Sequence, residues 1–349
     1  MFPNFPRSTP NLRSLILHRA ELLNRPDQPV DPFKPFPSTL RYLSLNDFPL
    51  YPSFLCLRSL TELDLTNERF NLHIDTLLNF LKGNHSLEIA TLRIRFAEPS
   101  LRGSQLGAAI ESRLRYLSIH CGNVADCGAL VSGIALQSGA HLEIEHGGYN
   151  TMLKRTLSVG HLSNLSPLTF MECRSYCRFI RLLGPNGALS LKALRGSEDP
   201  FSVFRLLPLY FTNVQEFRLE HRRPDEMSPP LDPIMFHPSF PPALETLAVD
   251  CETSLSHLFS ILFSNPSSSP SLKTLAFLDC DLTEDFMEEL TQYTSERKDT
   301  ASARLHRVVI TNSEGNFPSV TSIDALRKHV PVVDVRMSKE LPKDLTWKD

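Results

Sequence analysis

The segment Leu272-Lys273-Thr274-Leu275-Ala276-Phe277-Leu278-Asp279-Cys280-Asp281-Leu282 decides how this chain folds. Leu275 and Phe277 alternate with period two, as residues on one face of a short strand do. Leu272 enters the core before the strand, and Leu282 enters it again after the chain has turned away. One such segment cannot bury its apolar face alone, so the pattern requires neighbours that repeat it.

Copies of this spacing recur along the whole sequence. They start at Leu12, Leu40, Leu60, Ile89, Leu114, Gly139, Leu165, Leu191, Val214, Leu244, Leu272, Leu305 and Val332. Their separation averages roughly 27 residues, within the range of leucine-rich repeats, whose consensus has the same spacing. A long series in one frame is not expected by chance. The sequence therefore predicts a single domain of about 12 to 13 irregular leucine-rich repeats over residues 1–337.

Segments with helical periodicity lie between the predicted strands. They cover residues 75–81, 105–113, 127–137, 176–183, 201–211, 255–263, 283–290 and 322–329. A repeated order of strand and helix predicts an α/β fold, a leucine-rich-repeat solenoid shaped as a right-handed horseshoe, with a parallel concave sheet and convex helices. Proline-rich loop insertions are expected near residues 24–39 and 222–242, and residues 338–349 are expected to form a flexible tail.

Composition excludes several classes of function. The 349 residues include 21% charged residues with a net charge of -3, which gives no electrostatic attraction to nucleic acid or to an anionic membrane. No apolar stretch approaches the length of a membrane span. The seven cysteines show no paired spacing, which favours buried thiols in a reducing compartment. We expect a cytoplasmic or nuclear protein.

Catalysis has little support in the sequence. The segment His141-Leu142-Glu143-Ile144-Glu145-His146 matches neither zinc motif of helical spacing, and we interpret it as the polar face of a strand. No glycine-rich phosphate loop and no G-x-S-x-G motif is present. The prediction is a protein without enzymatic activity, cofactor or metal. The alternative is an enzyme with a site in the loop insertions, for which His141 and Glu143 are the candidates.

Residues that alternate with the buried leucines are expected on the concave face, where they would bind a protein partner. Tyrosine and arginine, which are frequent at interface hot spots, occur among them. Alternatively, Glu62 and Asp64 only neutralise Arg93 and Arg95 across neighbouring strands. Ala276 and Leu278, at later positions of the same face, could be covered by a loop or by the C-terminal tail. The predicted binding residues are Tyr42, Glu62, Asp64, Arg93, Arg95, Tyr116, His120, His141, Glu143 and Glu145.

The irregular repeats resemble the leucine-rich-repeat region of fungal F-box-like proteins. The resemblance is carried by residues 275–283, Phe286-Met287, 303–310 and 330–335. It implies a repeat module that selects the substrate of a cullin-RING ubiquitin ligase. The first repeat starts at Leu12 and leaves no room for an F-box before it, so contact with the Skp-cullin machinery is expected only if an F-box exists elsewhere. The alternative within binding proteins is a repeat-only inhibitor or regulatory protein without a link to a ligase.

Overall fold

The computed structural model describes residues 11–18, 39–48, 50, 54, 56–96, 110–121, 130–131, 133–146, 165, 167–174, 179–193, 212–221, 241–251, 259, 262–263, 269–298 and 304–337. The chain divides into two compact units. Unit 1 comprises residues 1–166 and 185–198, and unit 2 comprises residues 167–184 and 199–349. The proline-rich insertions lie almost entirely outside the described residues, and the tail 338–349 lies wholly outside them. The single repeat domain over residues 1–337 stays a prediction.

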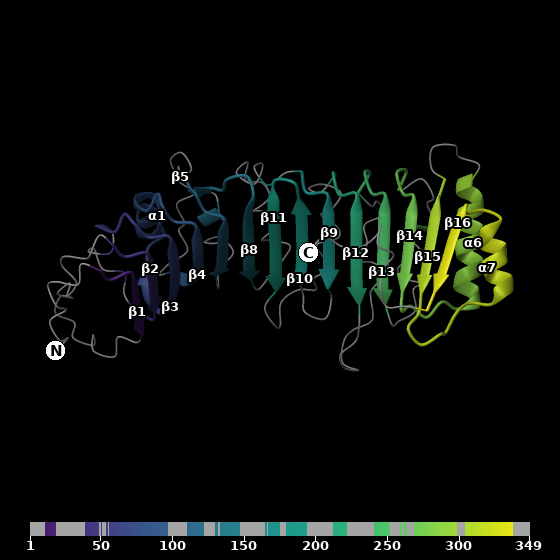
Figure 1. Ribbon diagram of the computed structural model, residues 1–349, viewed down its shortest axis with the longest axis horizontal. Coiled ribbons are helices and arrows are strands. Elements are labelled where there is room, and N and C mark those ends of the chain that lie inside the picture. The colour runs from purple at the N-terminus through teal and green to yellow at the C-terminus, as the bar shows by residue number, and fades with distance from the viewer. Residues whose placement is uncertain are drawn as a thin grey trace. The chain divides into compact units, whose positions relative to one another are not determined.

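Unit 1 is built on a parallel sheet (Figure 1). Neighbouring strands pair in parallel throughout this sheet. A helix, α1 (Ile74–Gly83), follows β3, and a short parallel pair consists of β5 (Ile110–Glu111) and β7 (Ile134–Ala135). The strands in order across the sheet are β1 (Ser14–His18), β2 (Tyr42–Asn46), β3 (Glu62–Leu72), β4 (Ile89–Phe96), β6 (Tyr116–Cys121), β8 (Ala140–His146) and β11 (Gly187–Ala193).

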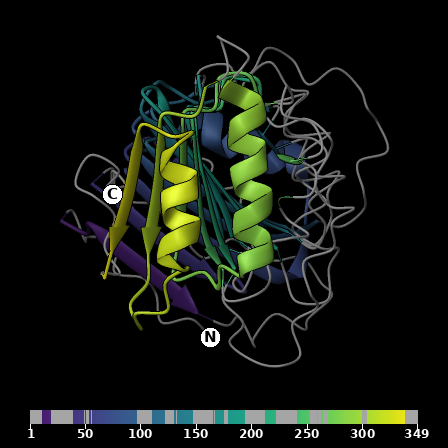
Figure 2. The same cartoon turned by 90° about the vertical axis from the view of Figure 1, so that its right-hand side faces the viewer.

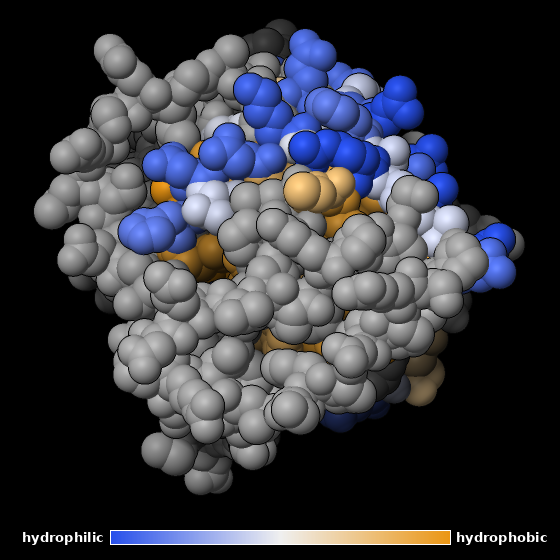
Figure 3. Space-filling view, turned by 90° about the vertical axis from the view of Figure 1, so that its left-hand side faces the viewer, coloured by the Kyte–Doolittle hydropathy of each residue, from blue (hydrophilic) through white to orange (hydrophobic). Residues whose placement is uncertain are grey.

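Stacked leucines form the core of unit 1. Leu43 and Leu45 of β2 pair in register with Leu63 and Leu65 of β3, and all four are fully buried. Burial of each such side chain stabilises the fold by about 1.5–3 kcal/mol. In the view from the β1 end, hydrophilic side chains are at the surface, and hydrophobic side chains are visible between and below them (Figure 3).

Unit 2 also contains a sheet, which is parallel except for one strand. That strand is β10 (Phe179–Gly184), which pairs antiparallel with β9 (Phe170–Arg174). Two helices, α6 (Glu284–Lys298) and α7 (Val320–Arg327), lie on one face of the unit 2 sheet (Figure 2). The remaining strands follow β9 in the order β12 (Glu216–His221), β13 (Thr246–Cys251), β14 (Thr274–Leu278), β15 (Arg307–Thr311) and β16 (Val332–Arg336).

An aromatic cluster joins α6 to the sheet of unit 2. The ring of Phe277 in β14 lies 5.5 Å from that of Phe286 in α6, and Phe259 packs against both. At the start of α6, the side-chain oxygen of Thr283 accepts a hydrogen bond from the Phe286 backbone nitrogen at 3.3 Å, as a helix N-cap does. The core of unit 2 therefore lies between α6 and the face of the sheet that carries Phe277.

The α/β class and the mostly parallel sheet are confirmed. The helices predicted at 75–81, 283–290 and 322–329 correspond to α1, α6 and α7. These are the helices with defined bounds in the part of the chain that the structure describes. The helix predicted over residues 176–183 is wrong, because residues 179–184 form β10. Ile180 and Leu182 are buried while Arg181 between them is half-buried, so period two describes this segment.

The frame of the repeat was wrong by a few residues in two strands of unit 2. In β9 the inward apolar residues are Met171 and Cys173, where the sequence indicated Leu168 and Phe170. Methionine and cysteine are apolar enough to take the place of leucine in a core, although they match the consensus poorly.

The last strand shows the same kind of error. In β16 the inward residues are Val333 and Val335, which pair with Val308 and Ile310 of β15. Val332, placed in the core by the sequence frame, has 48% of its surface exposed. Consecutive valines satisfy either alternation, so the pattern alone could not fix the register.

In unit 1 the frame shifts in β4 and β11. Ala90 and Leu92 pair with Leu63 and Leu65, so Ala90 occupies a position that the sequence frame gave to Leu92. In β11 the residues that pair with the core of β8 are Leu189 and Leu191, whereas the sequence frame started only at Leu191. Both shifts change which side chains stand beside one another on the opposite face.

Candidate protein-binding face

The face of the unit 1 sheet opposite the buried leucines carries mostly polar side chains, and we call it the outer face. Pairing registers arrange these side chains in rows across strands about 4.8 Å apart. The first row contains Tyr42, Glu62, Ile89, Tyr116 and His141; the second contains Ser44, Asp64, Thr91, Ser118, Glu143 and Ser190; the third contains Asn46, Thr66, Arg93, His120, Glu145 and Lys192.

Glu143 is the centre of a hydrogen-bonded cluster on this face. The Tyr116 hydroxyl donates to Glu143 Oε2 at 3.1 Å, and Lys192 Nζ donates to Glu143 Oε1 at 2.7 Å. Both carboxylate oxygens therefore have a partner, one from β6 and one from β11. Hydrogen bonds to a charged acceptor are stronger than neutral ones, so the three side chains hold one another in place.

The cluster shifts the pKa of each member. Partial burial acts to raise the pKa of Glu143, but the hydrogen bond and charge of Lys192 and the hydrogen bond of Tyr116 outweigh it, and the pKa is lowered. The hydrogen bond to Glu143 raises the pKa of Lys192. Burial, with the negative charge of Glu143, raises the pKa of Tyr116. At neutral pH the cluster is therefore a carboxylate, an ammonium and a neutral phenol.

His141 stands beside this cluster and contacts Ser190. Its Nε2 lies 2.8 Å from Ser190 Oγ, and its ring meets the Tyr116 ring edge-on with centroids 5.3 Å apart. A histidine at this distance from a serine also occurs where serine is a nucleophile. Ser190 is only 2% exposed, however, so its hydroxyl is closed to a substrate. The contact therefore fixes the orientation of the imidazole ring.

In the third row, Glu145 lies beside His120. His120 Nδ1 is 3.2 Å from Glu145 Oε2, a contact that does not have the geometry of a hydrogen bond. In the second row, Ser44 Oγ donates to Asp64 Oδ2 at 3.3 Å. These contacts tie side chains of neighbouring strands together, so the outer face is ordered before a partner arrives.

Arg93 and Glu62 are the exposed charges of the outer face. Within the described part of the chain, the Arg93 guanidinium forms no ion pair. Pairing sets Arg93 beside Thr66 and His120, and Glu62 beside Tyr42 and Ile89. Among the described side chains, no ion pair joins Arg93 to Glu62 or to Asp64, and the side chain of Arg95 lies outside them, so mutual neutralisation of these four residues stays a prediction.

The structure brings most of the predicted residues onto one face. Tyr116, His141 and Glu143 come together, His120 and Glu145 form a second contact, and the others lie on the neighbouring strands β2, β3 and β4. The side chain of Arg95 lies outside the described residues.

Sequence reasoning missed two members, Ser190 and Lys192. Both follow from the shifted frame in β11. The alternation of Ser190 and Lys192 with Leu189 and Leu191 is the signal that could have found them.

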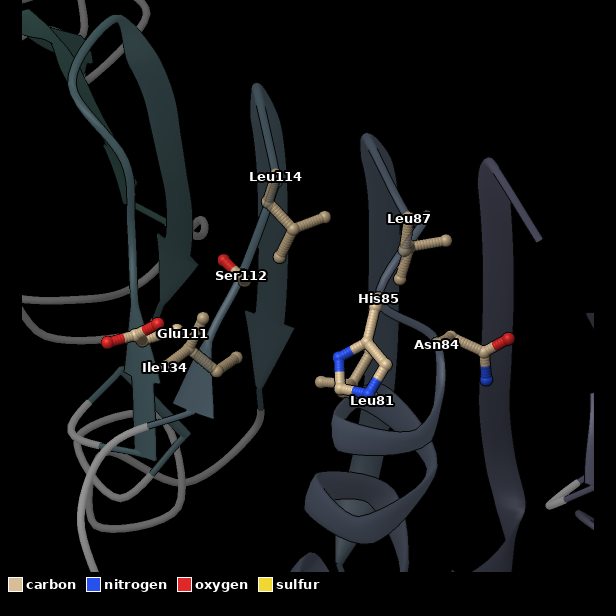
Figure 4. A pocket seen from close by; sticks show the side chains of 8 residues that line it. All are labelled: Leu81, Asn84, His85, Leu87, Glu111, Ser112, Leu114 and Ile134. Atoms are coloured by element: carbon tan, nitrogen blue, oxygen red, sulfur yellow. The ribbon is translucent and has the colours of Figure 1, made fainter. Parts of the chain in front are cut away.

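One pocket has a described lining, and none of its lining residues belongs to the three rows of the outer face (Figure 4). Leu81, Leu87, Leu114 and Ile134 form its apolar wall. It has room for about one water molecule, so it cannot enclose a substrate or a cofactor. Among the described residues, no three His, Cys, Asp or Glu side chains are placed to hold a metal ion.

No protein-family model matches the chain, and no curated protein matches its sequence. Within the described segments, no helix has the length and apolar character needed to cross a membrane.

Proposed function

We propose that the chain is a non-catalytic protein-interaction scaffold of the leucine-rich-repeat type, with a partner protein lying across the outer face of unit 1. The observation that carries the proposal is the ordered polar face itself. Stacked leucines bury one side of a parallel sheet, and the same register sets tyrosine, histidine, arginine and glutamate in rows on the other. Repeat proteins use extended surfaces of this kind for binding.

The chemistry of the face favours a protein partner over a small molecule. It is broad, and its aromatic and charged groups are spread over β2 to β11. Tyr116 and His141 give rigid contact area, and their hydrogen bonds reduce the side-chain entropy lost on binding. Arg93, exposed and without an ion pair among the described residues, would receive an acidic side chain of the partner.

The proposal can be tested by selecting binders from a displayed peptide library. Wild-type protein is the bait, and each selected peptide is measured again with Arg93→Glu, which reverses the exposed charge without touching the core. Arg327→Glu, on an exposed position of α7 in unit 2, is the matched control. We expect acidic peptides whose affinity falls at least tenfold, about 1.4 kcal/mol, with Arg93→Glu and is kept by the control. Equal affinity for the wild type and Arg93→Glu would place the site elsewhere.

The finer proposal is that the scaffold is the substrate-recognition module of an F-box-type ubiquitin-ligase receptor. Its support is the resemblance of the irregular repeats. Buried free thiols at Cys173, Cys251 and Cys280 fit a reducing compartment, the cytoplasm or nucleus. Affinity purification followed by mass spectrometry tests it. Recovery of Skp and cullin components supports the ligase role, and capture of other proteins without them favours a repeat-only inhibitor or regulatory protein.

One observation favours an enzyme as the second candidate, the 2.8 Å contact between His141 and Ser190. A fluorophosphonate probe reacts with serine that histidine has activated. We expect no labelling, because Ser190 is buried. Labelling of the wild type that disappears in Ser190→Ala would establish a hydrolase and remove the scaffold proposal.

A further inference from the structure

Two of the large apolar side chains that are exposed in the described part of the chain lie on the outer face of unit 1. Ile16 in β1 is 52% exposed, and Ile89 in β4 is 39% exposed. Pairing sets Ile16 beside Ser44 of the second row, and Ile89 belongs to the first row. Residues at these positions point away from the leucine core, so folding leaves both isoleucines in contact with water.

Two carboxylates lie between these isoleucines, on β3. Glu62 pairs with Ile89, and Asp64 follows two residues along the strand, about 7 Å away on the same face. Glu62 is exposed and Asp64 is half-buried, and neither forms an ion pair with a described side chain. The two negative charges repel each other, so a cation placed between them would be held by both.

Tyr42 of β2 stands beside the first of these carboxylates. It pairs in register with Glu62 and is half-buried, so part of its ring is open to solvent. A guanidinium binds a carboxylate through two parallel N–H donors and also stacks on an aromatic ring, and Glu62 with Tyr42 offers both contacts to one arginine. We call Ile16, Tyr42, Glu62, Asp64 and Ile89 the acidic strip.

We propose that the acidic strip binds an extended segment of the partner protein, which carries an arginine with a large apolar residue two positions away on either side. The arginine lies against Glu62 and Asp64, and the apolar residues pack on Ile16 and Ile89. From β1 to β4 the sheet measures about 14 Å, at 4.8 Å per strand, and four extended residues span the same length. Alternate residues of an extended segment share one face, so all three side chains reach the strip.

This inference rests on the proposed function, because the acidic strip is part of the outer face. What it adds is the order of charges on the partner. Arg93, which would receive an acidic side chain, lies on β4, four residues along the strand from Ile89. The partner therefore places positive charge over β3 and negative charge over β4. A segment with the opposite order would bring like charges together and bind less tightly.

The test uses the acidic peptides that wild-type protein selects from the displayed library. We expect them to contain an arginine between two apolar residues at the stated spacing. Glu62→Lys should lower their affinity at least tenfold, and Ile89→Ser should lower it about fivefold. Glu288→Lys, at an exposed position of α6 in unit 2, is the matched control and should keep the wild-type affinity.

Exchanging the two charges separates a direct contact from a change in fold. Glutamate in place of the peptide arginine should weaken binding to the wild type and restore binding to Glu62→Lys. Selected peptides without a central basic residue, or affinity that Glu62→Lys leaves unchanged, would overturn the inference. Affinity that falls with Arg93→Glu but not with Glu62→Lys overturns this inference alone, whereas affinity kept by both variants overturns the binding role of the outer face as well.

Discussion

Lys192 Nζ in β11 lies 2.7 Å from Glu143 Oε1 in β8, although the two residues are 49 positions apart in the sequence. In the sheet, Glu143 pairs with Ser190, so the lysine reaches the carboxylate diagonally from two residues further along its strand. The Tyr116 hydroxyl donates a hydrogen bond to the other carboxylate oxygen, Glu143 Oε2. The contact therefore reports directly on the register of β6, β8 and β11.

We predict that Glu143→Gln removes a pH-dependent contribution to stability. The pKa of Glu143 is lowered in the folded chain, so its contribution is present above the ordinary pKa of 4.5 and is lost as the pH falls through the folded value. At pH 7 we expect a loss of about 1 kcal/mol, limited by solvent screening. Urea denaturation of wild type and variant at pH 7 and pH 3 measures it.

The control for this prediction is Glu245→Gln, because the Lys273–Glu245 pair has the same kind of contact at 2.8 Å with both side chains about half exposed. Its loss should be smaller, about 0.5 kcal/mol or less. A difference between wild type and Glu143→Gln that stays constant from pH 3 to pH 7 would contradict the charged contact.

Arg297 is expected to be essential for the fold of unit 2. It is fully buried in α6, and it donates to the Tyr293 hydroxyl at 2.8 Å and to the backbone oxygens of Ser269 and Leu272 at 3.0 and 3.1 Å. Arg297→Met leaves these buried acceptors without a donor. The cost should be about 3–5 kcal/mol in the free energy of unfolding. Thermal denaturation should show a large loss for this variant and little change for the exposed Arg327→Met.

Asp279 follows β14 in a left-handed conformation, with φ of 48°, and its Oδ1 accepts a hydrogen bond from the Ser313 backbone nitrogen at 2.6 Å. Asparagine tolerates this conformation and keeps an acceptor, whereas alanine does neither. We predict a loss of about 1–3 kcal/mol for Asp279→Ala and a much smaller one for Asp279→Asn. Asp281→Ala, at an exposed position, is the control. Equal losses for the two Asp279 variants would contradict the role of the carboxylate oxygen.

The register of the last strand leads to a direct comparison of two valines. Val330 is buried and Val332 is largely exposed. Val330→Asp should therefore destabilise unit 2 by more than about 3 kcal/mol, because it buries a charge, while Val332→Asp should change stability by less than about 0.5 kcal/mol. Circular dichroism during denaturation measures both. The opposite order would restore the frame that the consensus indicated.

The sequence predicted well where leucine, isoleucine, valine or phenylalanine occupies both inward positions and a leucine stands three residues before the first of them, a leucine that β11 lacks because Asn186 is there. The strands that start after Leu40, Leu60, Leu114, Leu244 and Leu272 have the expected buried residues. It failed where alanine, methionine or cysteine takes an inward position, as in β4 and β9, and where apolar residues are consecutive, as in β16. In those strands burial comes from pairing with the neighbour, which a single repeat does not contain.

The same limit applies to the candidate face. Tyr116, His141 and Glu143 were predicted because their strands keep the consensus frame. Lys192 and Ser190 were missed because β11 does not. The burial of Ala276 and Leu278 was not decided by the sequence either, since both alternate with inward residues of their strand and were expected on the exposed face.

The binding role of the outer face is tested most directly by site-specific photo-crosslinking. A photoreactive amino acid is placed at Thr91 or Ser118, in the middle row of the outer face, and at Asn79 on the exposed side of α1 as the control. The probe is an acidic peptide selected with the wild-type protein. We predict crosslinks from Thr91 and Ser118 and none from Asn79. Crosslinks from Asn79 alone would show that the partner binds the helical side and would contradict a binding role for the outer face.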